Sequence, residues 1–219
     1  KIAKKALKPS RRNTGIMKNK KAYVVYEPIG TIGIISPWNY PLATPINATV
    51  EALLAGNNVI LKPSEYTPLT PLLIKKIWDK CTGFDNAFKI IIGSGKEGEA
   101  LVVSPEIDMI CFTGSTRIGK RIAKHCAENL KPVILELGGK DPMIVLRDAD
   151  MNRAVESALF AGYTNAGQTC ISVEEVFIEE SIFENFTKLI SSKVKSMSSG
   201  SGSDKEIGAM IMEKNAIKV

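Results

Sequence analysis

Glu136 and Cys170 carry the side chains best suited to chemistry, and both fall where the backbone is expected to change direction. Glu136 interrupts the apolar run at residues 133–137, which looks like a buried strand, and Gly138 and Gly139 follow closely, so its carboxylate is expected at a strand end. Cys170 lies between a helical stretch and an apolar segment. A carboxylate at a strand end suits proton transfer, and an accessible thiol suits nucleophilic attack.

Each of these residues also has a plainer interpretation. A lone Glu after an apolar run is more often a solvated strand terminus, and a lone Cys in an intracellular chain is usually a small core residue. Asn39 is a third candidate, because it lies between Pro37 and Pro41 and its side-chain N–H groups suit an oxyanion hole. Asn between prolines is about as often only a turn former. The three residues gain weight only in combination with the motifs around them.

Apolar strands and helices alternate along the middle of the chain. The expected strands cover residues 31–36, 58–62, 88–92, 108–113 and 133–137, and the expected helices cover 44–54, 72–80, 97–103 and 117–129. Such alternation is typical of a parallel sheet with helices on both faces. The sequence therefore predicts an α/β fold built on a doubly wound, open parallel sheet of about five strands, similar to a Rossmann fold. Cys111 is expected to be buried in the fourth of these strands. Outside the sheet we expect two short extended pieces between Ile16 and Glu27, a helix at 151–163 and a Ser/Gly-rich linker at 196–203.

Polar and glycine-rich segments follow these strands at the carboxyl edge, where such sheets bind ligands. Residues 62–65 (Lys-Pro-Ser-Glu) place a cation beside an anion in a manner suited to ribose hydroxyls. Residues 93–98 match Gly-x-Gly-x-x-Gly, but they form the third strand-to-helix turn, and no acidic residue closes the following strand. We interpret them as a tight turn near a cofactor, whereas Gly114 and Ser115 open a helix whose amides suit a phosphate. Each segment alone is also common in solvated turns.

Composition limits the class of protein. Residues 1–21 hold nine Lys or Arg and no acidic residue, so this basic arm carries +9 while the other residues carry a net charge of −3, which together give the net charge of +6. The arm has no interleaved aromatic residues for stacking bases, so we expect no nucleic-acid partner. No apolar run approaches the ~20 residues that cross a bilayer, and the start lacks the pattern of a secretory signal, so we expect a cytoplasmic protein without a membrane partner. Four scattered cysteines and the single His125 favour reduced thiols and no metal site.

Four segments together resemble the aldehyde dehydrogenase superfamily in content, order and approximate spacing. They are Pro-Trp-Asn-Tyr-Pro at 37–41, Phe-Thr-Gly-Ser-Thr at 112–116, and the segments around Glu136 and Cys170. The resemblance implies three regions: a basic extended arm at 1–27 used between subunits, a dinucleotide-binding domain at 28–137, and part of a catalytic domain at 138–219. It also implies a homo-oligomer or a complementing chain.

The resemblance implies oxidation of a small aldehyde to a carboxylic acid with NAD, NADP being less favoured because the Glu65 carboxylate repels a 2′-phosphate. Cys170 would attack the carbonyl, Asn39 would hold the oxyanion, and Glu136 would activate the water that hydrolyses the thioester. The implied cofactor-binding residues are Ile35, Ser36, Pro37, Trp38, Lys62, Ser64, Glu65, Gly95, Phe112, Gly114, Ser115, Ile118, Leu137 and Gly138.

The chain covers only the middle of the family pattern and departs from it at one position. The later Glu-x-Phe-Gly-Pro motif is missing, and Glu175 stands five residues after Cys170, where the family usually has Arg. From this we expect a truncated chain with weak activity on its own. An alternative is a non-catalytic nucleotide-binding or interaction remnant of such an enzyme.

Overall fold

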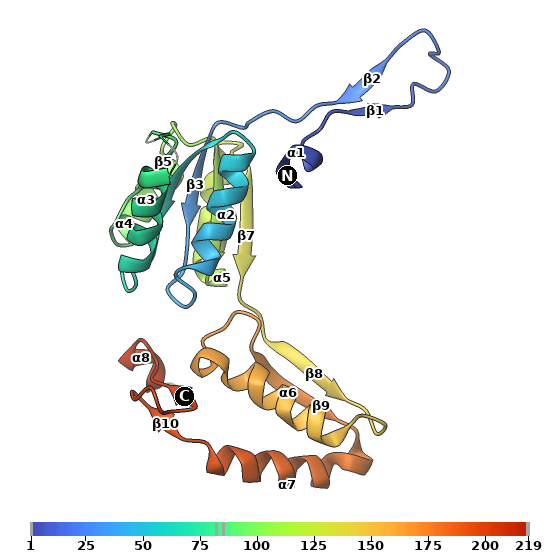
Figure 1. Ribbon diagram of the computed structural model, residues 1–219, viewed down its shortest axis with the longest axis vertical. Coiled ribbons are helices and arrows are strands. Elements are labelled where there is room, and N and C mark those ends of the chain that lie inside the picture. The colour runs from blue at the N-terminus through green and yellow to red at the C-terminus, as the bar shows by residue number, and fades with distance from the viewer. Residues whose placement is uncertain (1, 82, 85, 218–219) are drawn as a thin grey trace. The chain divides into compact units, whose positions relative to one another are not determined.

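The computed structural model describes residues 2–81, 83–84 and 86–217, and the chain forms two compact units. Unit 1 is Lys1–Leu137 and unit 2 is Gly138–Val219 (Figure 1). The division falls directly after the last strand of the predicted sheet. Each unit has its own core of buried apolar side chains, so each is described separately below.

Unit 1 contains a five-stranded parallel sheet in the order β5-β4-β3-β6-β7, which confirms the predicted fold class. The strands are β3 (Thr31–Ile35), β4 (Asn58–Lys62), β5 (Phe88–Ile90), β6 (Met109–Gly114) and β7 (Val133–Leu137). The chain starts in the centre at β3, builds outward through β4 and β5, and then returns to the other side of β3 for β6 and β7. The strand order therefore reverses between β3 and β6, which is where doubly wound sheets bind ligands.

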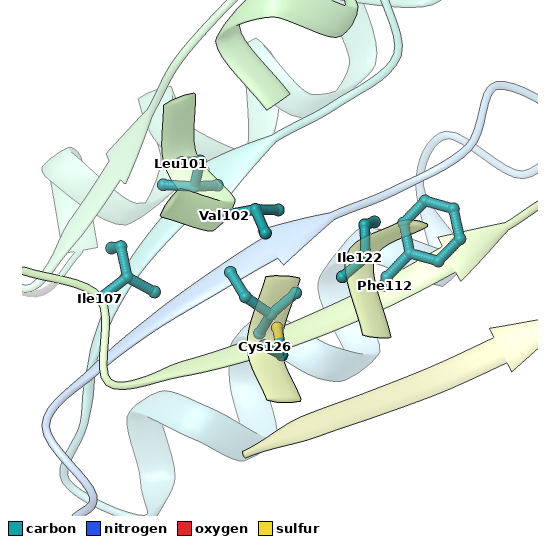
Figure 2. Packing of buried hydrophobic residues seen from close by; sticks show 7 residues of the cluster. Leu101, Val102, Ile107, Phe112, Ile122 and Cys126 are labelled. Carbon is teal, nitrogen blue, oxygen red and sulfur yellow. The ribbon is translucent and has the colours of Figure 1, made fainter. Parts of the chain in front are cut away.

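Four helices cover the two faces of this sheet. They are α2 (Ala43–Leu54), α3 (Leu69–Cys81), α4 (Gly95–Val103) and α5 (Thr116–Glu128). Helices α4 and α5 pack on one face, where Leu101, Ile122 and Cys126 meet Phe112 of β6 (Figure 2). Helices α2 and α3 cover the other face over β3, β4 and β5. Each strand contributes side chains to both cores, because neighbouring residues of a strand point to opposite faces of the sheet.

Strand β7 is an edge strand, and this overturns the expectation that its apolar run is buried. Its residues alternate between half-buried and exposed, and Ile134 and Glu136 lie on the exposed side. The half-buried residues join the core under α4 and α5, whereas α2 packs on β3 and β4 and leaves the opposite face of β7 open. Cys111 on the neighbouring strand is accordingly only half-buried, although the sequence predicted a buried position.

The basic arm folds into α1 (Ile2–Ala6) and a hairpin of β1 (Ser10–Arg12) and β2 (Ala22–Val24). The expected first extended piece at Ile16 is wrong, because Ile16 lies in the turn of the hairpin and is 95% exposed. Gly15 has φ +59°, which lets the backbone enter this turn at little steric cost.

Unit 2 is a parallel β-α-β unit with a second helix. Strands β8 (Asp141–Val145) and β9 (Val173–Ile178) pair in parallel, and α6 (Met151–Tyr163) and η1 (Thr164–Gly167) connect them. Helix α7 (Glu180–Ser196) follows, and Phe186 packs its inner side against α6. The expected Ser/Gly-rich linker at 196–203 instead contains β10 (Ser199–Gly200), which pairs with β11 (Ile207–Gly208) before α8 (Glu213–Ala216).

Candidate functional site

A pocket of about 370 Å³ opens in unit 1 at the carboxyl ends of β3, β4 and β6. It contains six residues from the predicted cofactor set: Ile35, Lys62, Glu65, Gly95, Phe112 and Ile118. These residues come from the ends of three strands and the starts of two helices. The structure therefore brings together residues that lie up to 83 positions apart, at the edge where the strand order reverses.

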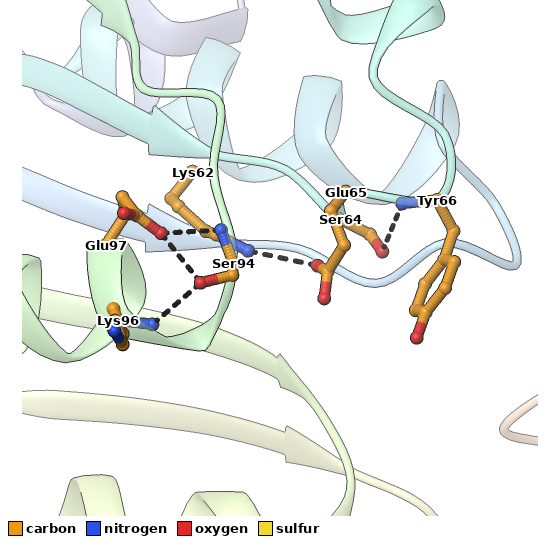
Figure 3. A network of polar contacts seen from close by, with 7 residues as sticks. All are labelled: Lys62, Ser64, Glu65, Tyr66, Ser94, Lys96 and Glu97. Carbon is orange, nitrogen blue, oxygen red and sulfur yellow. Dashed lines mark hydrogen bonds and ion pairs between the residues drawn. The ribbon is translucent and has the colours of Figure 1, made fainter.

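Lys62 and Glu65 form one charged pair in the lining of this pocket (Figure 3). Lys62 is 5% exposed, and its Nζ lies 3.3 Å from Oε2 of Glu65. A buried ammonium requires a nearby partner, and Glu65 supplies it while remaining partly open to solvent. The pair thus offers both a donor and an acceptor of hydrogen bonds in the lining of the pocket, as the recognition of a sugar diol requires.

The Gly-x-Gly-x-x-Gly segment forms the capped start of α4. Oε2 of Glu97 accepts hydrogen bonds from the backbone N–H of Ser94 at 2.6 Å and from its hydroxyl at 2.9 Å, while Ser94 Oγ accepts from the N–H of Lys96 (Figure 3). Hydrogen bonds from its own backbone N–H and from Ser94 hold the pKa of Glu97 below its ordinary value. A protein carboxylate thus takes the place that a phosphate occupies in a phosphate-binding turn.

The start of α5 is built differently. Ser115 is the N-cap residue, and its side chain makes no capping hydrogen bond within the described part of the chain. Gly114 and Gly119 are needed for close packing here, since a Cβ on either would lie 2.5 Å from the Phe112 ring or from Leu137 Cδ2, respectively. The helix N-terminus with amides and a hydroxyl available for an anion is therefore that of α5 rather than that of α4.

The end of β3 supplies a further polar group. Ser36 is 5% exposed, and its buried hydroxyl has no hydrogen-bond partner among the residues that the structure describes. Since buried polar groups are almost always paired, an unpaired hydroxyl at the ligand-binding edge of the sheet fits a bound cofactor. Pro37 and Trp38 follow directly, and the Trp38 carbonyl accepts from the hydroxyl of Thr67 at 3.4 Å.

Eight members of the predicted cofactor set do not line the pocket. Three of them, Ser36, Pro37 and Trp38, directly follow β3, and the other five lie at these same strand ends and turns: Ser64, Gly114, Ser115, Leu137 and Gly138. Ser64 is buried, and its Oγ accepts from the backbone N–H of Tyr66 at 3.3 Å (Figure 3). Leu137 is the last residue of unit 1 and Gly138 the first of unit 2.

Asn39 and Glu136 lie at the carboxyl edge of unit 1. Oδ1 of Asn39 accepts the backbone N–H of Tyr40 at 3.1 Å, which orients the side-chain amide with Nδ2 as its donor. Glu136 is exposed on the open face of β7. The thiol of Cys111 lies on that same face of the sheet, and its pKa is raised by burial and, to a smaller degree, by the negative charges of Glu136 and Glu51.

Cys170 lies in unit 2, in a turn between η1 and β9, and it is exposed. Buried Ser172 ties the far side of this turn to the end of α6, because its hydroxyl donates to the carbonyl of Ala161 at 3.1 Å. Of the other cysteines, Cys126 is buried and Cys81 is exposed at the end of α3. The structure therefore presents two open thiols, of which only Cys170 lies in a structured turn between elements.

The reversed charge at Glu175 has a partner. Oε1 of Glu175 in β9 lies 2.8 Å from Nζ of Lys140, the residue just before β8. Both side chains are about half exposed, so the pair is a surface ion pair of small energetic weight. The departure from the family pattern is thus neutralised locally.

The aldehyde dehydrogenase family model matches residues 1–219. The chain belongs to the aldehyde dehydrogenase family. It is 36% identical over 208 residues to succinate-semialdehyde dehydrogenase [NADP(+)] GabD of Escherichia coli (strain K12), covering 94% of this chain and 43% of that protein.

Solved structures agree with this membership. The crystal structure of an E. coli NADP-dependent enzyme superposes with a TM-score of 0.94 at 32% identity, covering 99% of this chain and 46% of that one. Betaine aldehyde dehydrogenase from Staphylococcus aureus in complex with NAD⁺ superposes with a TM-score of 0.90 at 33% identity, covering 96% and 42%. The chain thus spans less than half the length of these relatives.

Seven residues of the pocket in this aldehyde dehydrogenase chain were not predicted from the sequence. They are Lys96, Gly98, Glu99, Val102, Arg121, Ile122 and His125. A signal for them was present. On α5 the pocket residues recur at 118, 121, 122 and 125, which is the spacing of one helix face. Once Ile118 was placed in the site, the same face of the helix could have been extended to the others.

Among the described residues, no helix is both long and apolar enough to cross a membrane, and no group of three His, Cys, Asp or Glu side chains is placed to hold a metal ion.

Proposed function

We propose that this chain contributes the dinucleotide site and the nucleophile of an enzyme that oxidises a small aldehyde to a carboxylic acid. The observation that carries the proposal is the pocket in which buried Lys62 meets Glu65 at the switch point of the sheet. Family membership and an exposed thiol at Cys170 support it. In this proposal residues 28–137 bind the dinucleotide, residues 138–219 present the nucleophile, and the arm at 1–27 pairs with another subunit.

The proposed chemistry uses three residues. Sγ of Cys170 attacks the carbonyl carbon, and Nδ2 of Asn39 and the Cys170 backbone N–H stabilise the oxyanion, a kind of contact that lowers a barrier by ~3 kcal/mol. The adduct is a thiohemiacetal, and its carbon loses a hydride to a bound nicotinamide dinucleotide, which gives the thioester. The Glu136 carboxylate then takes a proton from water, whose oxygen attacks the thioester carbonyl and releases the acid and the thiol.

The residues present fit such a cofactor. Lys62 and Glu65 suit the adenosine ribose, the uncapped start of α5 suits the pyrophosphate, and the unpaired Ser36 hydroxyl lies at the same edge. We further propose a preference for NAD over NADP, because the Glu65 carboxylate repels a 2′-phosphate. The relatives named above include an NADP enzyme and an NAD⁺ complex, so the choice rests on this chain's own residues.

Calorimetric titration of NAD into residues 1–219 tests the cofactor site. We expect saturable binding, weakened about tenfold or more by Lys62→Ala, because the ribose loses a charged donor worth ~1.5–3 kcal/mol. The matched control is Lys124→Ala, a substitution of an exposed lysine on α5 that lies outside the pocket. Equal loss in both variants, or no NAD binding at all, would contradict the assignment.

Iodoacetamide labelling at neutral pH tests the nucleophile. We expect Cys170 to be alkylated first and Cys81, the other exposed thiol, to serve as the internal comparison. Faster alkylation of Cys81 would rule out the proposed role of Cys170. NAD binding together with an unreactive Cys170 would instead favour the alternative of a non-catalytic nucleotide-binding module.

A further inference from the structure

The backbone just before Cys170 is held in an unfavourable conformation. Asn165, Ala166 and Gly167 have φ values of +55°, +56° and +71°, so three consecutive residues adopt the left-handed region. Gly and Asn tolerate this region, but Ala does not, because its Cβ crowds the following carbonyl oxygen. Such a backbone persists only where the surrounding structure holds it in place.

The Gln168 side chain provides this hold through both ends of its amide. Its Nε2 donates to the carbonyl of Asn165 at 3.0 Å, and its Oε1 accepts the backbone N–H of Ile211 at 3.0 Å. In return, Nδ2 of Asn165 donates to the backbone carbonyl of Gln168 at 3.3 Å. Gln168 therefore bridges the strained turn, two residues before Cys170, to a segment 43 residues further along the chain.

The segment that Gln168 reaches is itself closed. We name residues 197–211 the C-terminal strap. Its two ends are paired through β10 and β11, and Glu206 Oε2 accepts the backbone N–H of Ser198 at 2.9 Å. The strap also packs against η1 through β11. The Gln168 amide therefore joins the strained turn to a segment that is itself paired and packed beside η1.

We propose that Gln168 is a positioning residue for Cys170, and that it presents the thiol by fastening the strained turn to the C-terminal strap. The inference rests on the proposed function only in naming Cys170 as the nucleophile. Ser172 fixes the turn on its other side through the end of α6. With Gln168 in place, Cys170 is held from both directions, two residues before it and two residues after it.

The test is the alkylation rate of Cys170 by iodoacetamide, mapped by mass spectrometry, with Cys81 of the same molecule as the internal control. In Gln168→Ala we expect a rate at least about fivefold lower, because the variant loses both hydrogen bonds of the amide and one ordinary hydrogen bond alone corresponds to about fivefold. The freed turn then spends time in conformations that cover the thiol. The Cys81 rate stays the same. Gln168→Glu keeps the acceptor for the Ile211 N–H but loses the donor to Asn165. Its Cys170 alkylation rate should therefore lie between those of the unsubstituted chain and of Gln168→Ala.

The decisive variant is a rescue. Ala166→Gly removes the Cβ that makes the left-handed conformation costly, so the double variant Ala166→Gly with Gln168→Ala is expected to recover at least about half of the lost rate. An unchanged Cys170 rate in Gln168→Ala would overturn the proposal. A loss that Ala166→Gly fails to restore would overturn it as well, since it would show general damage to unit 2.

The labelling requires neither aldehyde nor cofactor, so it is separate from the proposed function. A chain that fails to bind NAD but shows the loss and the rescue would overturn the function and leave the positioning role intact. A chain that binds NAD and shows equal Cys170 rates in all variants would overturn the positioning role alone.

Discussion

The two units of this chain solve the problem of presenting a reactive group in opposite ways. In unit 1 helices cover both faces of the sheet, except at the open face of edge strand β7, and the pocket is built from the ends of regular elements. In unit 2 the two-stranded sheet is covered on one face, while Ile144, Leu146 and Phe177 are exposed. Its candidate nucleophile lies on a turn with three left-handed residues.

The difference bears on the part that each unit plays in the proposed function. Binding half of a dinucleotide requires rigid strand ends and helix starts, and unit 1 contains them. Chemistry at a carbonyl requires the thiol, the oxyanion donors and the base to be placed within a fraction of an ångström. In the proposed mechanism Asn39 and Glu136 come from unit 1 and Cys170 from unit 2, so residues of both units are required for turnover.

Turnover should show the largest effect. We expect residues 1–219 to oxidise short aliphatic and aromatic aldehydes about 100-fold or more below the ordinary range of roughly 1 s⁻¹ and above, because misplacement by ~1 Å costs that much. The measurement is NADH absorbance, with Cys170→Ala as the control. Ordinary turnover that Cys170→Ala abolishes would show that the two units suffice.

Independent folding of the units can be tested with a matched pair of core substitutions. Phe88→Ala in unit 1 and Phe186→Ala in unit 2 each remove a side chain that is 2% exposed or less, and each should destabilise its own unit by ~3–5 kcal/mol. Both tryptophans, Trp38 and Trp78, lie in unit 1. In urea, the midpoint of tryptophan fluorescence should therefore shift for Phe88→Ala and stay unchanged for Phe186→Ala, whereas circular dichroism should report both. A shift of the fluorescence midpoint by Phe186→Ala would mean that the units unfold together.

Cofactor choice sharpens the account of unit 1. Glu65→Ser should narrow the difference in binding free energy between NAD and NADP, because like charges a few ångströms apart cost ~1–4 kcal/mol depending on screening. Calorimetric titration of both cofactors measures the difference. Glu106→Ser, which removes an exposed carboxylate outside the pocket, is the control and should leave it unchanged. Tighter binding of NADP by the unsubstituted chain would refute the preference.

The smallest effect concerns one carboxylate in each unit. Hydrogen bonds from its own N–H and from Ser94 lower the pKa of Glu97, and hydrogen bonds from the backbone and side chain of Arg147 lower that of Glu179. A lowered folded-state pKa adds stability above the unfolded pKa of about 4.3, and this stability is lost as the pH falls through the folded value.

Glu97→Gln and Glu179→Gln should therefore lower the thermal midpoint of their own unit slightly at neutral pH and converge with the unsubstituted chain in acid. Melting curves at several pH values measure this. A difference that persists undiminished in strong acid would mean that packing, rather than the carboxylate charge, makes the contribution.

Local sequence patterns predicted most of the helices and strands. β4, β7 and α6 have the bounds that their apolar patterns predicted, because a buried strand or an amphipathic helix leaves its period in the sequence. The Ser94–Glu97 capping box could also be read locally, since donor and acceptor lie three residues apart. The predicted extended piece at Ile16 was wrong. A basic arm without a buried face has no alternation of apolar and polar residues from which its strands could be located.

The sequence by itself determined the parallel sheet, the edge at which its polar segments gather and the three candidate catalytic residues. Only the tertiary structure decided that β7 is an edge strand with an open face and that Lys62 is buried against Glu65. It also decided that Lys140 forms an ion pair with Glu175. The physical reason is the distance along the chain over which each effect acts. The apolar period and helix capping depend on residues a few positions apart. Burial and the hydrogen bond from the Ile211 N–H to Gln168 depend on residues that only the folded chain brings together.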